Sequence, residues 1–165
     1  MLNIPDPGFA GDDGSASAAV TAALSAYSAD PTAYVDVLAT LQRQRLLVPV
    51  VAVLGEVEYD ERGLAHDKTS DMATVLIQGR DGRLALLAFT STETMQRWDP
   101  HARPVPARLD RVAASAVQDK ASAIVLDVAG PTSFVIEQDD LTALAEGFTL
   151  VEVAGGVAWA KEGEA

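Results

Sequence analysis

The chain contains no cysteine among its 165 residues, which excludes disulfide bonds, thiolate nucleophiles and sulfur-ligated metal sites. Aromatic residues make up only 5% of the sequence, so we expect a core of small branched side chains without a large aromatic pocket. No apolar run approaches the roughly 20 residues that cross a bilayer, and the first residues lack the basic start of a secretory signal. We therefore expect a cytoplasmic protein.

Positive charge is also scarce, with 12 basic against 24 acidic residues and a formal net charge of −12. The resulting negative potential repels phosphate backbones and anionic lipid surfaces. The charge balance argues against nucleic acid and membranes as partners.

Histidine occurs only twice, as His66 and His101, and both fall in expected loops without a third ligand at helical spacing. The carboxylates between Glu56 and Asp71 lack the repeating spacing of a calcium loop, and a solvated loop explains them better than a cation site. The sequence lacks a Gly-x-Ser-x-Gly elbow, and Gly79-Arg80-Asp81-Gly82 lacks the remainder of a phosphate-binding loop. We expect no metal, no cofactor and no catalytic residue.

The length suits one domain, and periodicity divides it into helices and strands. Residues 1–14 are rich in Gly, Pro and Asp and are predicted to form a flexible arm, followed by one domain over 15–165. Apolar spacing predicts helices over 15–29, 31–44, 108–119 and 139–148. β-rich runs predict strands over 46–54, 72–78, 84–89, 123–128, 133–136, 149–154 and 157–160. Because Asp81-Gly82 favours a tight turn, the second and third of these strands should form a hairpin. Prolines 100, 104 and 106 predict a loop. The pattern indicates an α+β domain with a mixed, largely antiparallel sheet covered by helices.

The segment after the strand that ends at Phe89 is the candidate binding site. Thr90 and Glu93 have the spacing of a capping box, which predicts a short helix that ends after Trp98. Free amides and hydroxyls at such a helix start can hold a carboxylate, with Trp98 as an apolar wall. The candidate binding residues are Phe89, Thr90, Ser91, Thr92 and Trp98. The alternative is that these residues only cap the helix and pack against the sheet.

Several segments resemble the N-terminal domain of the SseB family, named for enhanced serine sensitivity. They are Leu47-Val48-Pro49-Val50, Lys68-Thr69-Ser70-Asp71-Met72-Ala73, the run from Asp81-Gly82-Arg83 to Ala88-Phe89-Thr90-Ser91, Trp98 before Pro104-Val105-Pro106, Val125-Leu126-Asp127 with Gly130-Pro131, and Leu141 to Gly147. The resemblance places the family core at about 46–147. It implies a non-enzymatic α/β-type domain without a settled role.

Two functional hypotheses follow. The first is a protein-interaction or regulatory module that binds itself or another protein through an exposed strand edge or through the Trp98–Pro106 surface. The second is a sensor that binds a small amino acid or similar carboxylate at the helix start after Phe89. Nothing in the residues favours an enzyme.

Overall fold

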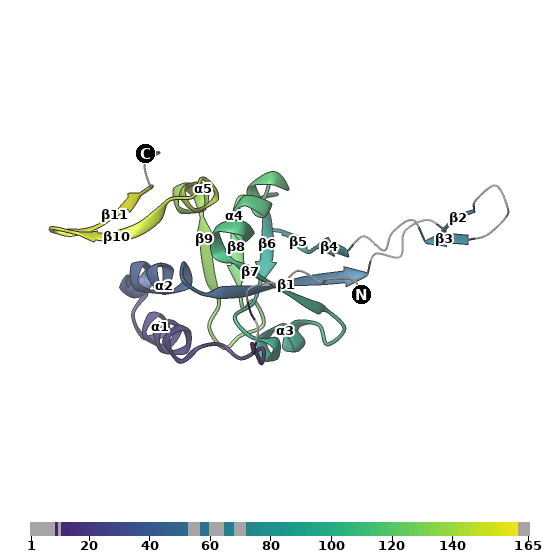
Figure 1. Ribbon diagram of the computed structural model, residues 1–165, viewed down its shortest axis with the longest axis horizontal. Helices are drawn as coiled ribbons and strands as arrows, with labels where there is room; N and C mark the ends of the chain where they lie inside the picture. The colour runs from purple at the N-terminus through teal and green to yellow at the C-terminus, as the bar shows by residue number, and fades with distance from the viewer. Residues whose placement is uncertain (1–8, 10, 53–56, 60–64, 68–71, 162–165) are drawn as a thin grey trace.

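The computed structural model describes residue 9 and residues 11–52, 57–59, 65–67 and 72–161. Its elements follow the chain in the order α1 (Ala18–Ala29), α2 (Tyr34–Leu41), β1 (Arg45–Ala52), β2 (Val57–Tyr59), β3 (Ala65–Asp67), β4 (Met72–Thr74), β5 (Leu76–Gln78), β6 (Leu84–Ala88), α3 (Thr92–Trp98), β7 (Arg103–Arg108), α4 (Leu109–Gln118), β8 (Ala123–Leu126), β9 (Phe134–Glu137), α5 (Gln138–Ala145), β10 (Thr149–Val153) and β11 (Gly156–Ala160) (Figure 1). A 3-10 turn at Pro31–Ala33 precedes α2.

Two sheets organise the domain. The first has the strand order β5-β6-β8-β9, in which only β6 and β8 are parallel. The second has the order β4-β1-β7 and is antiparallel. They are joined where Leu47 and Phe89 exchange two backbone hydrogen bonds of 2.8 Å. The predicted fold class, an α+β domain with a mixed and mostly antiparallel sheet, is confirmed.

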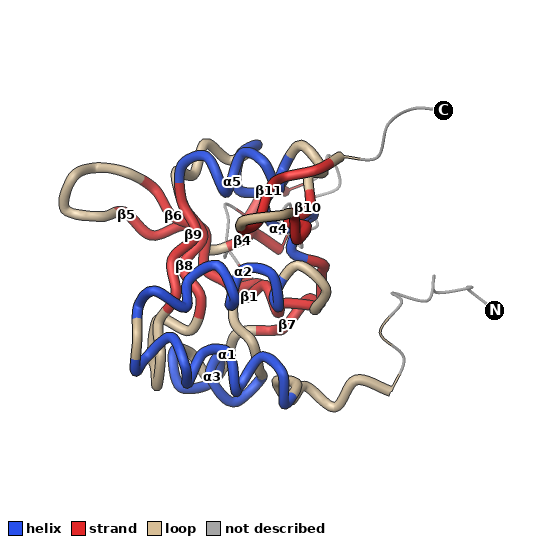
Figure 2. Tube along the Cα trace, turned by 90° about the vertical axis from the view of Figure 1, so that its left-hand side faces the viewer, coloured by secondary structure: helices blue, strands red, loops and turns tan. Residues whose placement is uncertain are grey.

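The main core lies on one face of the first sheet. Leu86 and Ala88 of β6 point into it, together with buried residues of β8 and β9 and the apolar stripes of α1, α2, α4 and α5. On α4 the buried positions are Leu109, Val112, Ala113 and Ala116, the spacing of one helical face. Figure 2 shows these helices beside the strands. The larger core therefore fixes α1 and α2 relative to β6 and β8.

A smaller core lies on the opposite face, where α3 packs. Because side chains alternate along a strand, Leu87 and Phe89 point away from the main core. They meet Leu47, Met95 and Ala102 in a separate buried cluster. This packing holds α3 against the end of β6.

The predicted hairpin after Thr74 is confirmed, since β5 and β6 pair in antiparallel register around Gly82, whose φ is +83°. The single strand predicted over 72–78 is wrong in one respect. Its first part, β4, pairs with β1, whereas its second part, β5, pairs with β6. Val75 marks the change of sheet, which hydrophobicity alone does not reveal.

The loop predicted around the prolines is wrong, because Arg103–Arg108 forms the edge strand β7. Leu47 directs its N–H and C=O to Phe89, on the side away from β7, so the Leu47–Pro106 pair is not hydrogen-bonded. The nitrogen atoms of Pro106 and Pro104 therefore face the outer edge. Proline fits there because it removes no internal ladder bond, and it leaves this edge poor in donors for a further strand.

In the part of the chain that the structure describes, no helix combines the length and the apolar character that a membrane crossing requires.

Candidate binding groove

The structure divides the five predicted site residues into two groups. Thr90, Ser91 and Thr92 line a groove beside α3. Phe89 is completely buried, and Trp98 is half-buried with its ring centroid 5.7 Å from that of Phe89. The two aromatic residues belong to the smaller core and do not line the groove.

The start of α3 is capped one residue later than the sequence predicted. Ser91 is the N-cap, and its hydroxyl accepts a hydrogen bond of 3.1 Å from the amide of Thr94. Glu93 does not complete a capping box with Thr90; its carboxylate pairs with Arg97 one turn further on, at 2.7 Å. Thr90 and Ser91 both carry a hydroxyl group, so the sequence pattern alone does not decide which of them is the N-cap.

Thr90 is instead bonded to a buried carboxylate. Asp127 directly follows β8, is 2% exposed and accepts hydrogen bonds from the Thr90 amide at 2.8 Å, the Thr90 hydroxyl at 2.6 Å and the Thr94 hydroxyl at 2.8 Å. The contact arises because β6 and β8 are parallel and end side by side, with Ala88 opposite Leu126. The carboxyl ends of parallel strands are a common place for ligands. Here the chain's own carboxylate occupies that place.

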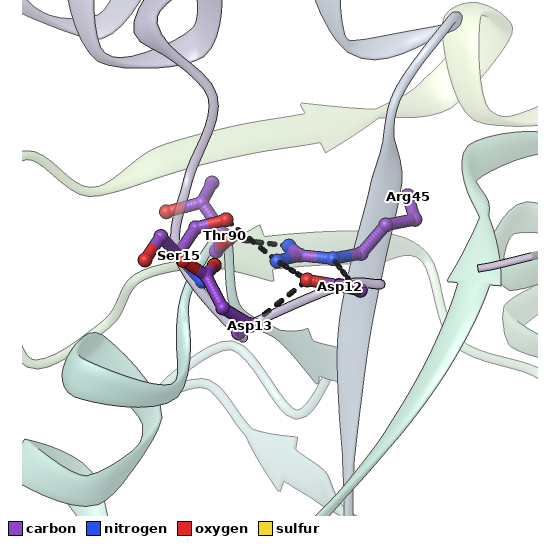
Figure 3. Close-up of polar contacts among 6 residues, drawn as sticks. Asp12, Asp13, Ser15, Arg45 and Thr90 are labelled. Carbon is purple, nitrogen blue, oxygen red and sulfur yellow. Dashed lines mark hydrogen bonds and ion pairs between the residues drawn. The ribbon is translucent and has the colours of Figure 1, made fainter. Parts of the chain in front are cut away.

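Arg45 ties the N-terminal segment to the same point (Figure 3). Its guanidinium donates two hydrogen bonds to the Asp12 carboxylate, at 2.6 and 3.0 Å, and one each to the carbonyl oxygens of Ser15 and Thr90, at 2.7 and 2.6 Å. The Arg45 side chain is 11% exposed. Hydrogen bonding to this guanidinium is the main cause that lowers the pKa of Asp12. Asp12 is therefore ionised at neutral pH.

The described end of the predicted arm is thus part of the domain. Besides the Asp12 contact, the carbonyl of Gly14 accepts a hydrogen bond of 2.8 Å from the Thr92 amide. Gly14 has a φ of +84°, a conformation that side chains disfavour. Asp12 and Gly14 thus make hydrogen bonds to the domain although they precede the predicted boundary, Ser15; residues 1–8 and 10 lie outside the described residues.

These contacts occupy three of the amides near the start of α3 that a bound carboxylate could use. The amide of Thr90 donates to Asp127, that of Thr92 to the Gly14 carbonyl, and that of Thr94 to the Ser91 hydroxyl. A ligand carboxylate would have to displace an internal acceptor from each of them. It would also lie beside the Asp127 carboxylate.

The groove itself has a volume of about 930 Å³ and runs between the N-terminal segment, α1, α3 and the loop after β8. It is lined by Asp13, Gly14, Ser15, Ala16, Thr21, Leu24, Ser25, Ser28, Ala29, Thr90, Ser91, Thr92, Glu93, Thr94, Gln96, Arg97, Asp127, Pro131 and Thr132. Both views place α1 and α3 on the same side of the molecule (Figures 1 and 2). We call it the hydroxyl groove, because nine of these nineteen residues carry a hydroxyl group.

The sequence of α1 explains one wall. Val20, Leu24 and Tyr27 recur on one helical face and pack into the main core. The hydroxyl residues Thr21, Ser25 and Ser28 repeat with the same spacing, one position later, and are exposed. The same helix therefore buries one stripe and presents the other to the groove.

The lining is more acidic than basic. Asp13, Glu93 and Asp127 face a single cation, Arg97, which already pairs with Glu93. Hydrogen bonds from Ser15 lower the pKa of Asp13, which is therefore ionised at neutral pH. The groove favours a ligand that carries positive charge.

Among the other sequence candidates for metal ligands, the one whose side chain the structure describes, His101, does not line this site. His101 is 92% exposed and lies near Asp99, with 3.6 Å between the imidazole Nδ1 and the carboxylate. The side chains between Glu56 and Asp71, His66 included, lie outside the described residues. Among the residues that are described, no group of three or more His, Cys, Asp or Glu is placed to hold a metal ion.

Sequence reasoning missed Asp12, Arg45 and Asp127 as members of the site. Asp12 and Arg45 are 33 positions apart and have no local pattern that links them. Asp127 has a signal, because an acidic residue directly after a buried strand lies at the sheet's carboxyl edge. That signal requires β6 and β8 to be known as parallel neighbours.

Comparisons with known proteins identify the family. Neither the curated proteins nor the solved structures give a match. The model of the SseB protein N-terminal domain matches residues 20–143, three quarters of the chain. The match therefore includes most of α1 and all of α2, which precede the expected core of 46–147. The match covers most of the groove, from α1 to the loop after β8. The chain therefore belongs to the SseB family, of which it carries the N-terminal domain.

Proposed function

We propose that this chain is a non-catalytic, cytoplasmic protein-interaction domain that holds a segment of a partner protein, rich in Lys or Arg, in the hydroxyl groove. The observation that carries the proposal is the excess of carboxylates over cations in an open groove in which nine of the nineteen lining residues carry a hydroxyl group.

The composition of the lining favours a peptide over a small molecule. Pockets for small molecules place only a few polar groups in their lining, whereas nine of the nineteen residues around this groove carry a hydroxyl group. The exposed hydroxyls of Thr21, Ser25 and Ser28 both donate and accept, so they can bond the N–H and the C=O groups of a peptide backbone. Ala29 and Pro131, both exposed, supply an apolar part against which side chains of the segment can pack.

Charge selects the class of segment. The lining has three carboxylates, those of Asp13, Glu93 and Asp127, and one guanidinium, that of Arg97. This excess of negative charge attracts cationic side chains. The net charge of −12 speeds the approach of a basic partner from a distance. Both effects weaken as salt is added.

The residues of the groove argue against catalysis. The lining contains no histidine, lysine or cysteine to activate a nucleophile. The hydroxyls of Thr90 and Thr94 donate to Asp127, which also accepts the Thr90 amide. These groups are engaged in holding β6, β8 and α3 together.

The sensor hypothesis receives less support from the same geometry. A free amino acid would bring its carboxylate to α3, where the amides of Thr90, Thr92 and Thr94 already have acceptors. Its ammonium group would meet the more favourable environment, because the lining has more carboxylates than cations.

The test is a titration of ¹⁵N-labelled protein, followed by amide resonances. Two ten-residue peptides of Gly and Ser are compared, one with four Lys and one with four Glu at the same positions, and free serine forms a third arm. We expect saturable shifts at Ser25, Ser28 and Thr92 with the Lys peptide alone. Shifts with serine at Thr90–Thr92 would favour the sensor, and silence in the groove with all three ligands would overturn both hypotheses.

A further inference from the structure

The hairpin formed by β10 and β11 lies beyond the residues that the family model matches and projects from the rest of the domain (Figure 1). Its strands pair in antiparallel register around Ala154 and Gly155. A two-stranded sheet is marginally stable by itself in water. The hairpin is anchored at its base by Leu150 and Trp159, which pack against the main core.

The pairing register shows which backbone groups point outward. A two-residue turn joins Val153 and Gly156, so these two residues form a hydrogen-bonded pair. Bonded and non-bonded pairs alternate, which leaves the N–H and C=O groups of Leu150, Glu152, Val157 and Trp159 on the outer edges. The contacts of Leu150 agree, since its N–H and C=O bond the side-chain amide of Gln42 at 2.8 and 3.0 Å.

The two edges of the hairpin therefore differ. Gln42 covers part of the β10 edge, on the side of α2. On the β11 edge, no described residue bonds the outward groups of Val157 and Trp159, and β11 pairs with β10 alone. The edge of β7 carries Pro104 and Pro106, whereas β11 contains no proline. An open edge of this kind receives added strands.

We propose that the edge of β11 pairs with the β11 edge of a second copy, in antiparallel register about a two-fold axis at Ala158. In this register, Val157 of each copy lies opposite Trp159 of the other copy. Each such pair exchanges two N–H···O bonds, about four in total. It also makes two aromatic–aliphatic cross-strand pairs, a favourable combination. The proposal is independent of the hydroxyl groove.

Self-complementarity favours a second copy as the occupant, and the local charge permits it. Copies of a chain with a net charge of −12 repel one another over most of their surfaces. Residues 156–160 carry no charged side chain, so two copies can meet there with little repulsion. Val157 is 44% exposed and thus accessible. The short contact predicts a weak dimer, with Kd roughly between micromolar and millimolar.

The test exploits the two-fold axis, because Ala158 opposes its own copy. Ala158→Asp and Ala158→Lys each place like charges opposite each other, and each should weaken the dimer at least roughly tenfold in sedimentation equilibrium. An equimolar mixture of the two variants should recover dimers. Ala158 is exposed and is paired within the hairpin with the exposed Val151, so both variants should fold.

Val157→Pro is a second variant, since it removes an outward N–H and no bond to β10. It should abolish dimers while far-ultraviolet circular dichroism stays unchanged. A wild-type protein that stays monomeric at roughly 1 mM overturns the proposal. So does a dimer that is unaffected by these variants, since its contact would lie elsewhere.

Discussion

Replacing Asp127 tests whether the ends of β6 and β8 are held together by its carboxylate. Asp127→Ala removes the acceptor for the Thr90 amide and for the hydroxyls of Thr90 and Thr94. The Thr94 hydroxyl has another acceptor, the Ser91 carbonyl at 3.0 Å. Two buried donors of Thr90 then lose their partner.

The structure sets the size of the effect. Each unsatisfied buried donor costs about 1–3 kcal/mol. Because water can enter from the groove and bond these donors, we expect a total below the maximum, about 3 kcal/mol for the two donors. Asp127 also has a φ of +52°, which Ala tolerates poorly, and this adds about 1 kcal/mol. For a chain of this length, a loss of 3–4 kcal/mol lowers Tm by roughly 6–16 °C.

Two further variants separate the causes, each measured by urea unfolding. Asp127→Gly relieves the backbone and should be about 1 kcal/mol more stable than Asp127→Ala. Asp127→Asn keeps one acceptor oxygen and tolerates a positive φ, so it should lose about 1 kcal/mol. An Asp127→Ala protein as stable as the wild type would refute the buried, hydrogen-bonded role of this carboxylate.

Three other changes probe the remaining contacts. Asp12→Asn should cost about 1 kcal/mol of unfolding free energy at neutral pH. Because Arg45 lowers the pKa of Asp12, this contribution is present above the ordinary pKa of 3.8 and is lost on acidification. The urea midpoints of the two proteins should therefore converge well below pH 4, and a constant difference between them would contradict the ion pair. Burial, and then the hydrogen bond to Asp140 at 2.7 Å, raise the pKa of Tyr34. The stability that neutral Tyr34 contributes is therefore present below about pH 10 and lost as the pH rises further. Between pH 8 and 11 the urea midpoint of Tyr34→Phe should fall less than that of the wild type, and equal falls would count against the contact. Trp98→Ala should cost about 2 kcal/mol of unfolding free energy through lost packing on Phe89. Peptide binding in calorimetry should stay unchanged, and weaker binding by a folded variant would show that Trp98 is part of the binding site.

Local signals predicted much of the fold. The hairpin around Gly82 follows from Asp81-Gly82 between two apolar runs, and α4 follows from one apolar stripe. β7 could not be recognised in this way, because prolines usually exclude a strand. Pro104 and Pro106 are tolerated only because their nitrogen atoms face the free edge, which depends on the contact between Leu47 and Phe89.

The candidate site was predicted in part. The hydroxyl-rich segment Thr90–Thr92 signals a helix start, and the structure places it in the groove. What the segment contacts depends on pairings distant in sequence: Thr92 with Gly14, and Thr90 with Asp127. These partners satisfy the amides of Thr90 and Thr92 within the chain, and the open part of the groove lies between these contacts and α1.

The most direct test of the groove as a binding site compares two variants of α1. Ser25→Arg places bulk and positive charge in the groove, whereas Ala19→Arg adds the same side chain at an exposed position that does not line it. With the Lys peptide in isothermal titration calorimetry, we predict that Ser25→Arg raises Kd at least roughly tenfold and Ala19→Arg roughly twofold or less. Equal changes in Kd for the two variants would contradict binding in the hydroxyl groove.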